Sequence, residues 1–345
     1  MSAKQYSAPD ALSDGAAKRW EYLKAYGTNS LSFHTFQPGL DYYEIHPHGY
    51  IAYKDFGPAR FVLCDPVCDK SDMGLMLERL DRSHKRITFF HLTETSANIL
   101  DGMGYYVNEM GEEAVIDIPE YTFAGRRKMD IRHLHNRGRK DGVEVREIYG
   151  DDNIYEQARR ISISWLKDLK KTSNELWFIT RRPIYSDYFC VRKFYGFIDG
   201  QVVAYVYFDP VWDGNELKGY CPSILRNRPE APKGALAWII HEALQKFKAE
   251  HAGKLYLGLM PFYNLEDDIN NRYCHSPYTK KLLEWVYKSK ITNSFYGFRS
   301  LTFHKQRYSA NSSKVYMATK SRFPAFDLLF SALMVGFFKP FNKGL

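Results

Sequence analysis

Three polar side chains near the middle of the chain, Lys128, Arg132 and Asn136, recur at intervals of four residues. On a helix this spacing places them on one face, with Arg139 close by. Like charges at such a spacing repel one another, so a face that keeps them suits a bound anion. The alternative is a basic helix that is simply solvated. The segment 125–142 is therefore predicted to be a basic helix that meets an anionic partner.

The cysteines and histidines do not have the spacing of metal ligands. His133 and His135 lie two residues apart and cannot share a helix face. An odd number of scattered cysteines favours reduced thiols over a disulfide framework. We therefore expect no metal and no cofactor, and five reduced cysteines: Cys64, Cys68, Cys190, Cys221 and Cys274.

The charge balance indicates what the surface attracts. The 345 residues carry 48 Lys and Arg against 40 Asp and Glu, a formal charge of +8. Such a surface favours polyanions such as tRNA, anionic lipid headgroups or nucleotides. The first 18 residues are polar and lack the apolar core of a signal peptide, so a cytoplasmic location is expected.

Short aromatic or β-branched runs in the first part of the chain predict an antiparallel meander. A helix from Arg19 to Tyr26 comes before them, ended by Gly27. A second helix, Met73 to Arg82, follows the third run and has an apolar face. The expected strands are 42–45, 50–54, 59–63 and 86–91.

Similar elements return after residue 145. A helix from Ile154 to Lys170 precedes two strands joined by the hairpin signal Asp199-Gly200, and a helix from Ala235 to Glu250 leads into another strand. This order is typical of an acetyltransferase, so we predict an α/β (α+β) chain with a tandem duplicated acetyltransferase-like (GNAT) fold and mixed sheets. The expected parts are a polar tail 1–18, a first half 19–124, the basic linking helix 125–142, a second half 143–320 and an amphipathic C-terminal helix 321–345.

The C-terminal segment has apolar residues at helical spacing. The run from Phe323 to Phe341 is interrupted and too short to span a bilayer. It suits a helix lying on an anionic membrane, and packing against the second half is the alternative. The repeating residues are Phe326, Leu329, Phe330, Leu333, Phe337 and Phe338, with Lys339 and Lys343 behind them.

Several short motifs carry a resemblance that runs from about residue 20 to residue 320. They are Tyr26-Gly27-Thr28-Asn29-Ser30, Gly49-Tyr50-Ile51-Ala52-Tyr53, Cys64-Asp65-Pro66, Gly111-Glu112-Glu113-Ala114, the basic segment 123–142, Ser223-Ile224-Leu225-Arg226 with Pro229 to Gly234, Leu257-Gly258-Leu259-Met260-Pro261, and Phe298 to Tyr308. In this order and spacing they resemble the C-terminal catalytic domain of phosphatidylglycerol lysyltransferases, the multiple peptide resistance factor family, as a stand-alone member.

The resemblance implies transfer of an aminoacyl group from aminoacyl-tRNA to phosphatidylglycerol or a related acceptor. Such a reaction needs a positioned nucleophile, a route for its proton and donors for the developing oxyanion. The candidate catalytic residues for this chemistry are Arg226, Ser223, Glu112, Glu113 and Asp209. The implied substrate-binding residues are Lys128, Arg132, Asn136, Arg137, Lys233, Arg299 and Lys305.

Two departures from the family pattern qualify that implication. Ser223 stands at the position of the acidic residue in the family's Asp-Leu-Met-Arg segment. We also expect the chain to lack the family's N-terminal transmembrane flippase. A peripheral position on the inner face of the cytoplasmic membrane, reached through the C-terminal helix, is expected.

Other interpretations stay open. An acyl-CoA-dependent N-acyltransferase predicts a glycine-rich turn for the pyrophosphate, and the nearest segment, 228–234, contains prolines that remove backbone donors. An inactive module that binds anionic lipid or RNA fits the change at Ser223. Individual residues also have structural alternatives: Glu112 and Arg226 in ion pairs, and Asp209, before a proline, in a turn.

Overall fold

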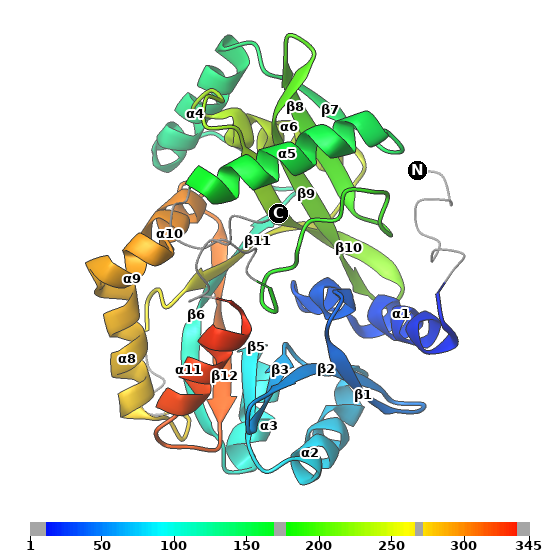
Figure 1. Ribbon diagram of the computed structural model, residues 1–345, viewed down its shortest axis with the longest axis vertical. Helices are drawn as coiled ribbons and strands as arrows, with labels where there is room; N and C mark the ends of the chain where they lie inside the picture. Colours follow the sequence, from blue (N-terminus) through cyan, green and yellow to red (C-terminus); the bar gives the residue numbers. More distant parts are fainter. Residues whose placement is uncertain (1–11, 169–176, 266–271, 337–345) are drawn as a thin grey trace.

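The computed structural model describes residues 12–168, 177–265 and 272–336. Its strands in these ranges join into one 12-stranded mixed sheet, in the order β1-β2-β3-β5-β12-β6-β11-β10-β9-β8-β7, with β4 paired to β2 (Figure 1). The strands are β1 Asp41–Ile45, β2 Gly49–Phe56, β3 Ala59–Leu63, β4 Val67–Cys68, β5 Ile87–Leu92, β6 Tyr106–Asp117, β7 Glu144–Glu147, β8 Arg192–Ile198, β9 Gln201–Asp213, β10 Glu216–Asn227, β11 Lys254–Pro261 and β12 Asn311–Thr319.

The same arrangement of elements occurs twice. In the first unit β1, β2 and β3 are antiparallel, and a helix then returns the chain to β5, which is parallel to β3. In the second unit β8, β9 and β10 are antiparallel, and α6 returns the chain to β11, which is parallel to β10. The acetyltransferase-like order expected from the sequence is therefore present in both halves of one mixed α/β fold.

The two units exchange a strand. The strand β6 follows the first unit along the chain but pairs with β11 of the second, whereas β12 follows the second unit and pairs with β5 of the first. β6 and β12 also pair with each other at the centre of the sheet. This exchange joins the two units into one sheet, because the strands of each unit pair with the last strand of the other. The boundaries 19–124 and 143–320 remain a sequence-based division.

Helices cover the sheet and pack on it through apolar faces (Figure 1). Helices α8, α9 and α10 follow one another along one side of the molecule, and α11 lies in front of the central strands. The helices are α1 Asp14–Tyr26, α2 Met73–Ser83, α3 Glu94–Gly102, α4 Met129–Lys140, α5 Asp152–Asp168, α6 Ala235–Ala249, α8 Pro277–Lys288, α9 Lys290–Phe295, α10 Phe298–Gln306 and α11 Ala325–Met334.

Some boundaries differ from the sequence-based expectation. The helix α1 begins at Asp14, inside the predicted polar tail, because the Ser13 side chain accepts a hydrogen bond from Ala16 N and caps it. Asp209 lies inside the buried strand β9, so the alternative interpretation of Asp209 as a turn residue was wrong. The pattern also left β6 and β12 unassigned, since both carry polar residues whose partners lie far away in sequence.

The C-terminal segment is a helix in its described part. α11 covers 325–334, whereas Phe337, Phe338, Lys339 and Lys343 lie outside the described residues. Within the ranges that the structure describes, none of the helices has the length and apolar character needed to cross a membrane.

Candidate active site

The parallel strands β10 and β11 separate soon after they meet. They pair only at Gly219 with Lys254 and at Tyr220 with Leu255. Gly219 is required there, because a Cβ would lie 2.0 Å from the Lys254 carbonyl oxygen. Beyond Tyr220 the register of β10 shifts between Pro222 and Ile224 as it runs along β9. In open α/β sheets ligands bind outside the carboxyl ends of the strands, and for β10 and β11 this is the end at which the two strands part, which we call the gap.

Glu113 on β6 is the carboxylate next to this gap. It pairs with Leu259 of β11, and its side chain accepts a hydrogen bond from the Ser30 hydroxyl. His91 Nε2, at the end of β5, lies 4.0 Å from Glu113 Oε1. We call Ser30, His91, Glu113, Cys221 and Lys305 the Glu113 cluster. It gathers residues from both units of the fold.

Burial gives Glu113 an unusual pKa. Loss of solvation raises the pKa of Glu113 to about 7, although the hydrogen bond from Ser30 and the charge of Lys305 act in the opposite direction. A carboxyl group with this pKa exchanges protons readily at neutral pH, which is what general acid and base catalysis requires.

Lys305 of α10 enters the same region. Its Nζ donates to the Leu259 carbonyl oxygen at 2.8 Å, which leaves further N–H donors on the ammonium group. The approach depends on Gly258, since a Cβ there would lie 3.3 Å from Nζ, and its φ of +80° also favours glycine. Burial lowers the pKa of Lys305 to about 8, against the charges of Cys221 and Glu113. The side chain is therefore mostly protonated at pH 7.

His91 is the residue of the cluster with the most unmet hydrogen-bonding capacity. It is 2% exposed, and neither ring nitrogen has a hydrogen-bond partner within the described part of the chain. Burial lowers its pKa to about 3, so the ring is neutral and presents one donor and one acceptor. Buried polar atoms of this kind are rare, and a ligand can satisfy them.

Glu112, the neighbouring residue, faces the opposite side of β6. It accepts hydrogen bonds from Asn264 Nδ2 at 2.7 Å and Ser312 Oγ at 2.8 Å, and Lys314 Nζ lies 3.3 Å away. Lys314 also contacts Glu109 at 3.2 Å. Glu112 is thus held in an ion pair, although with Lys314 of the second half and not within the first half as its structural alternative proposed. It is not part of the Glu113 cluster.

Asp209 lies in a second buried group, which we call the Asp209 cluster: Asp209, Arg181 and His34. The Arg181 guanidinium donates two hydrogen bonds to the carboxylate, through Nε at 2.7 Å and through Nη2, and His34 Nε2 is 3.2 Å away. Burial acts to raise the pKa of Asp209, but the charge of Arg181 and the hydrogen bonds lower it to about 2. Such a carboxylate stays ionised and does not exchange protons near neutral pH.

Arg226 and Ser223 lie further along β10. The Arg226 guanidinium stacks on the Trp165 ring at 3.8 Å, and its Nη1 donates to the Leu225 carbonyl oxygen at 2.8 Å. The Ser223 hydroxyl donates to the Tyr207 carbonyl oxygen at 3.3 Å. Both side chains are partly buried, and neither contacts Glu112, Glu113 or Asp209 by a described hydrogen bond or ion pair. Their catalytic roles stay predictions.

The basic linker divides into two kinds of residue. Lys128 Nζ donates to the Thr122 carbonyl oxygen at 2.6 Å, and Arg132 donates to the carbonyl oxygens of Phe123 and Gly125. These two side chains therefore hold the start of the linker. The other predicted binding residues are exposed: Asn136, Arg137, Lys233 and Arg299, with Arg137 3.7 Å from Asp141.

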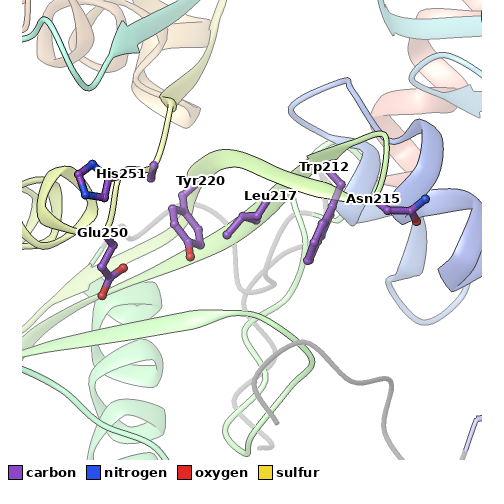
Figure 2. Close-up of a pocket in the computed structure, with 7 residues that line it drawn as sticks. Trp212, Asn215, Leu217, Tyr220, Glu250 and His251 are labelled. Atoms are coloured by element: carbon purple, nitrogen blue, oxygen red, sulfur yellow. The ribbon is translucent and has the colours of Figure 1, made fainter. Parts of the chain in front are cut away.

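A hollow of about 410 Å³ lies elsewhere, at the start of β10. Figure 2 shows Tyr220, Leu217 and Trp212 along the β9–β10 hairpin, with Glu250 and His251 on the other side. Its carboxylate, Glu250, is already paired with Arg192. Because this carboxylate is held in an ion pair, whereas Glu113 has a pKa near 7, the Glu113 cluster is the better candidate for chemistry.

No group of three or more His, Cys, Asp or Glu side chains able to hold a metal ion is found among the residues that the structure describes. The described cysteines are free.

The fold and the Glu113 cluster define a class of protein: a two-unit α/β chain with a buried acid-base pair beside a split sheet. The family model for "Phosphatidylglycerol lysyltransferase, C-terminal" matches residues 20–319. The chain belongs to this family.

Relatives by sequence carry the same name. The chain is 21% identical to a phosphatidylglycerol lysyltransferase of Bacillus subtilis (strain 168) over 263 residues, which cover 74% of this chain and 29% of that protein. It is also 21% identical to one from Staphylococcus haemolyticus, with 90% of this chain and 36% of that protein covered. The chain thus spans about a third of the length of these curated relatives.

Solved structures show the same fold. The C-terminal domain of a protein described as a lysylphosphatidylglycerol synthetase from Agrobacterium fabrum superposes with a TM-score of 0.75 at 16% identity, covering 95% of this chain and 98% of that one. The structure of L-PGS from Bacillus licheniformis also gives 0.75, at 19% identity, covering 92% and 95%.

The resemblance named Glu113 and Lys305 from the sequence, and the structure brings these two together. Ser30, His91, Arg181 and His34 were not singled out. A histidine at the end of the apolar run 86–91 was the one available signal for His91, because a buried histidine needs partners. The other three had no local signal.

Proposed function

We propose that the chain transfers an aminoacyl group from aminoacyl-tRNA to the hydroxyl of phosphatidylglycerol or a related acceptor, and that the Glu113 cluster carries the reaction. The observation that supports this most directly is the burial of Glu113 beside Ser30 and His91, with the charge of the Lys305 ammonium close enough to act on it. The pKa of Glu113 is raised to about 7 there, and that of Lys305 is lowered to about 8. Family membership supports lipid aminoacylation as the class of reaction.

In the proposed step the acceptor hydroxyl attacks the carbonyl carbon of the aminoacyl ester. A new ester C–O bond forms, and the C–O bond to the tRNA ribose breaks. The Glu113 carboxylate takes the proton of the acceptor and returns it to the leaving ribose oxygen. The Lys305 ammonium stabilises the oxyanion. The step balances without a cofactor.

His91 and Ser30 have supporting roles in this proposal. The neutral His91 ring offers hydrogen bonds to the bound acceptor or donor, and Ser30 orients the Glu113 carboxylate by its hydrogen bond. Asn136, Arg137, Lys233 and Arg299 are exposed cations or amides suited to phosphates of either substrate. Arg226 stays a candidate for a phosphate or for developing charge.

We also propose a peripheral position on the inner face of the cytoplasmic membrane. α11 packs on the sheet through one side, where Asp327 and Met334 are buried, and exposes Phe326, Leu329 and Leu333 on the other. The two interpretations of this helix, packing and membrane contact, thus apply to different faces of it.

The experiment is transfer of a labelled lysyl group from lysyl-tRNA to phosphatidylglycerol vesicles by the purified chain, with parallel arms that offer other aminoacyl-tRNAs or acetyl-CoA. Glu113→Gln should lower the rate of product formation by about 10² to 10⁴-fold, whereas Glu112→Gln, on the opposite face of the same strand, should retain it. Product from acetyl-CoA alone would redirect the assignment to an acyl-CoA enzyme. Equal activity of the wild type and Glu113→Gln would refute the role of the cluster.

A further inference from the structure

Large apolar side chains are exposed mainly on one part of the molecule. Of twelve such side chains in the described ranges, eight lie between residues 278 and 333, on α8 to α11 and the segment before α11. These helices lie together in Figure 1. A concentration of this kind marks a contact surface.

The helix α8 has an exposed stripe with two kinds of residue. Tyr278, Lys281, Trp285 and Lys288 are spaced by three or four residues, so they share one face, and all are exposed, Trp285 by 56%. Leu283 is buried on the inner face. Alternating aromatic and basic residues suit the boundary between lipid headgroups and acyl chains.

The helix α11 adds an aliphatic stripe. Phe326, Leu329 and Leu333 share one face and are exposed, Phe326 by 66%. Its opposite face is anchored, because Asp327 is 2% exposed and pairs with Arg86. The apolar stripe therefore belongs to a fixed helix.

A ring contact joins the two helices. The Tyr278 ring of α8 and the Phe323 ring just before α11 are in contact, with centroids 4.2 Å apart and planes tilted by 33°. The two stripes thus meet in one surface. We call it the docking face: Tyr278, Lys281, Trp285, Lys288, Phe323, Phe326, Leu329 and Leu333.

The charge of this region complements an anionic partner. Residues 277–334 contain ten Lys and Arg but only two acidic residues, Glu284 and Asp327. Glu284 lies 3.6 Å from Lys288, and Asp327 pairs with Arg86. Some of the ten cations lie away from the docking face, such as Lys305 in the Glu113 cluster and Lys314, which pairs with Glu109. The docking face itself contributes the exposed Lys281 and Lys288.

We propose that the docking face seats on the surface of an anionic lipid bilayer. Aliphatic residues such as Leu329 and Leu333 gain little from nucleic-acid bases, which stack on aromatic and guanidinium groups, whereas they insert readily among acyl chains. Lysines beside them attract anionic headgroups. A bilayer therefore explains both the apolar and the basic residues.

This inference rests on the proposed function, because docking on a bilayer would bring a lipid acceptor to the enzyme. Its measurement needs no donor or turnover. Glu113→Gln should bind vesicles like the wild type. Vesicle binding without transfer would therefore count against the proposed reaction alone.

The experiment measures co-sedimentation of the full chain with vesicles of phosphatidylcholine, with and without phosphatidylglycerol. Trp285→Ser and Phe326→Ser should each weaken binding to the anionic vesicles by about tenfold. Lys281→Gln and Lys288→Gln should each weaken it about fivefold. Met129→Ser, which removes an apolar side chain of similar exposure on α4, is the matched control and should bind normally.

Fluorescence gives a second measurement that does not depend on folding of a polar variant. The Trp285 emission is obtained as the difference between the spectra of the wild type and Trp285→Phe. It should shift to shorter wavelength when anionic vesicles are added. Absence of that shift, or no binding of the wild type to anionic vesicles, would overturn the proposal. So would loss of tRNA binding in Trp285→Ser with vesicle binding intact, because the face would then bind nucleic acid.

Discussion

Two buried carboxylates, Glu113 on β6 and Asp209 on β9, have pKa values that their surroundings shift in opposite directions. The pKa of Glu113 rises to about 7, and that of Asp209 falls to about 2. Asp209 is opposite Cys221 in the β9–β10 register. Burial raises the pKa of this thiol, and the charges of Glu113 and Asp209 both raise it further. The two carboxylates therefore lie near each other and are both buried, so burial alone does not explain the difference between their pKa values.

The difference lies in how each cation is placed. Arg181 forms a two-pronged ion pair with Asp209, whereas Lys305 directs a donor at the Leu259 carbonyl oxygen and acts on Glu113 only through its charge. A guanidinium held in hydrogen-bond contact outweighs the loss of solvation, and a displaced ammonium does not. The Asp209 cluster is suited to holding segments together, and the Glu113 cluster to moving a proton.

Removing the proton acceptor should have the largest effect. Glu113→Gln keeps the size and the hydrogen bond to Ser30 but loses the ionisable group, so aminoacyl transfer should fall by about 10² to 10⁴-fold. The free energy of unfolding at pH 8 should not fall, because a buried charge has been removed. Steady-state transfer and urea unfolding of the same preparation test both statements. Activity close to that of the wild type would remove the distinction between the two carboxylates.

Breaking the other pair should act on stability. Asp209→Asn leaves the buried Arg181 charge uncompensated and should cost about 3–5 kcal/mol of unfolding free energy. The matched double variant Arg181→Met, Asp209→Leu removes both charges and should recover much of the loss. Chemical denaturation measures these values. A double variant as unstable as the single one would show that hydrogen bonding, and not the charge, stabilises the cluster.

The pH dependence of stability should have opposite signs for the two groups. Glu113 has a folded-state pKa raised from 4.5 to about 7, so its contribution to stability is complete below 4.5 and is lost as pH rises through 7. The slope is at most about 1.4 kcal/mol per pH unit. Asp209 has a pKa lowered from 3.8 to about 2, so its contribution is present above 3.8 and is lost as pH falls to 2.

Unfolding of the wild type and Glu113→Gln across pH 4.5 to 7 isolates the first slope. The difference in unfolding free energy between them should change steadily in favour of Glu113→Gln as pH rises. A constant difference would show that Glu113 titrates normally. Activity should depend on Glu113 and Lys305, rising as Glu113 ionises near pH 7 and falling as Lys305 loses its proton near pH 8.

The smallest effect is expected at Glu112. Glu112→Gln weakens an ion pair with Lys314 on the other face of β6 and should cost about 1–2 kcal/mol of stability while activity stays within about twofold. Thermal unfolding and transfer assays measure the two. A loss of activity as large as that of Glu113→Gln would mean that Glu112 and Glu113 both take part in the reaction. The two faces of β6 would then not differ in function.

Part of the fold followed from local pattern. Apolar periodicity predicted the helices now seen as α2, α5 and α6, since a helix needs one apolar face to pack. It did not predict β6, whose Glu109 and Glu112 are neutralised by Lys314, about 200 residues away. A strand with buried charges has no local signal, because its partners are distant.

The sequence by itself determined the family, through ordered motifs such as Gly111-Glu112-Glu113 and Leu257-Gly258-Leu259, and it named Glu113 and Lys305 as candidates. Only the tertiary structure decided which carboxylate is poised for proton transfer. Ser30 lies 83 positions from Glu113, and Arg181 lies 28 from Asp209. A pKa depends on solvation and on charges within a few ångströms, and both are set when distant segments pack together.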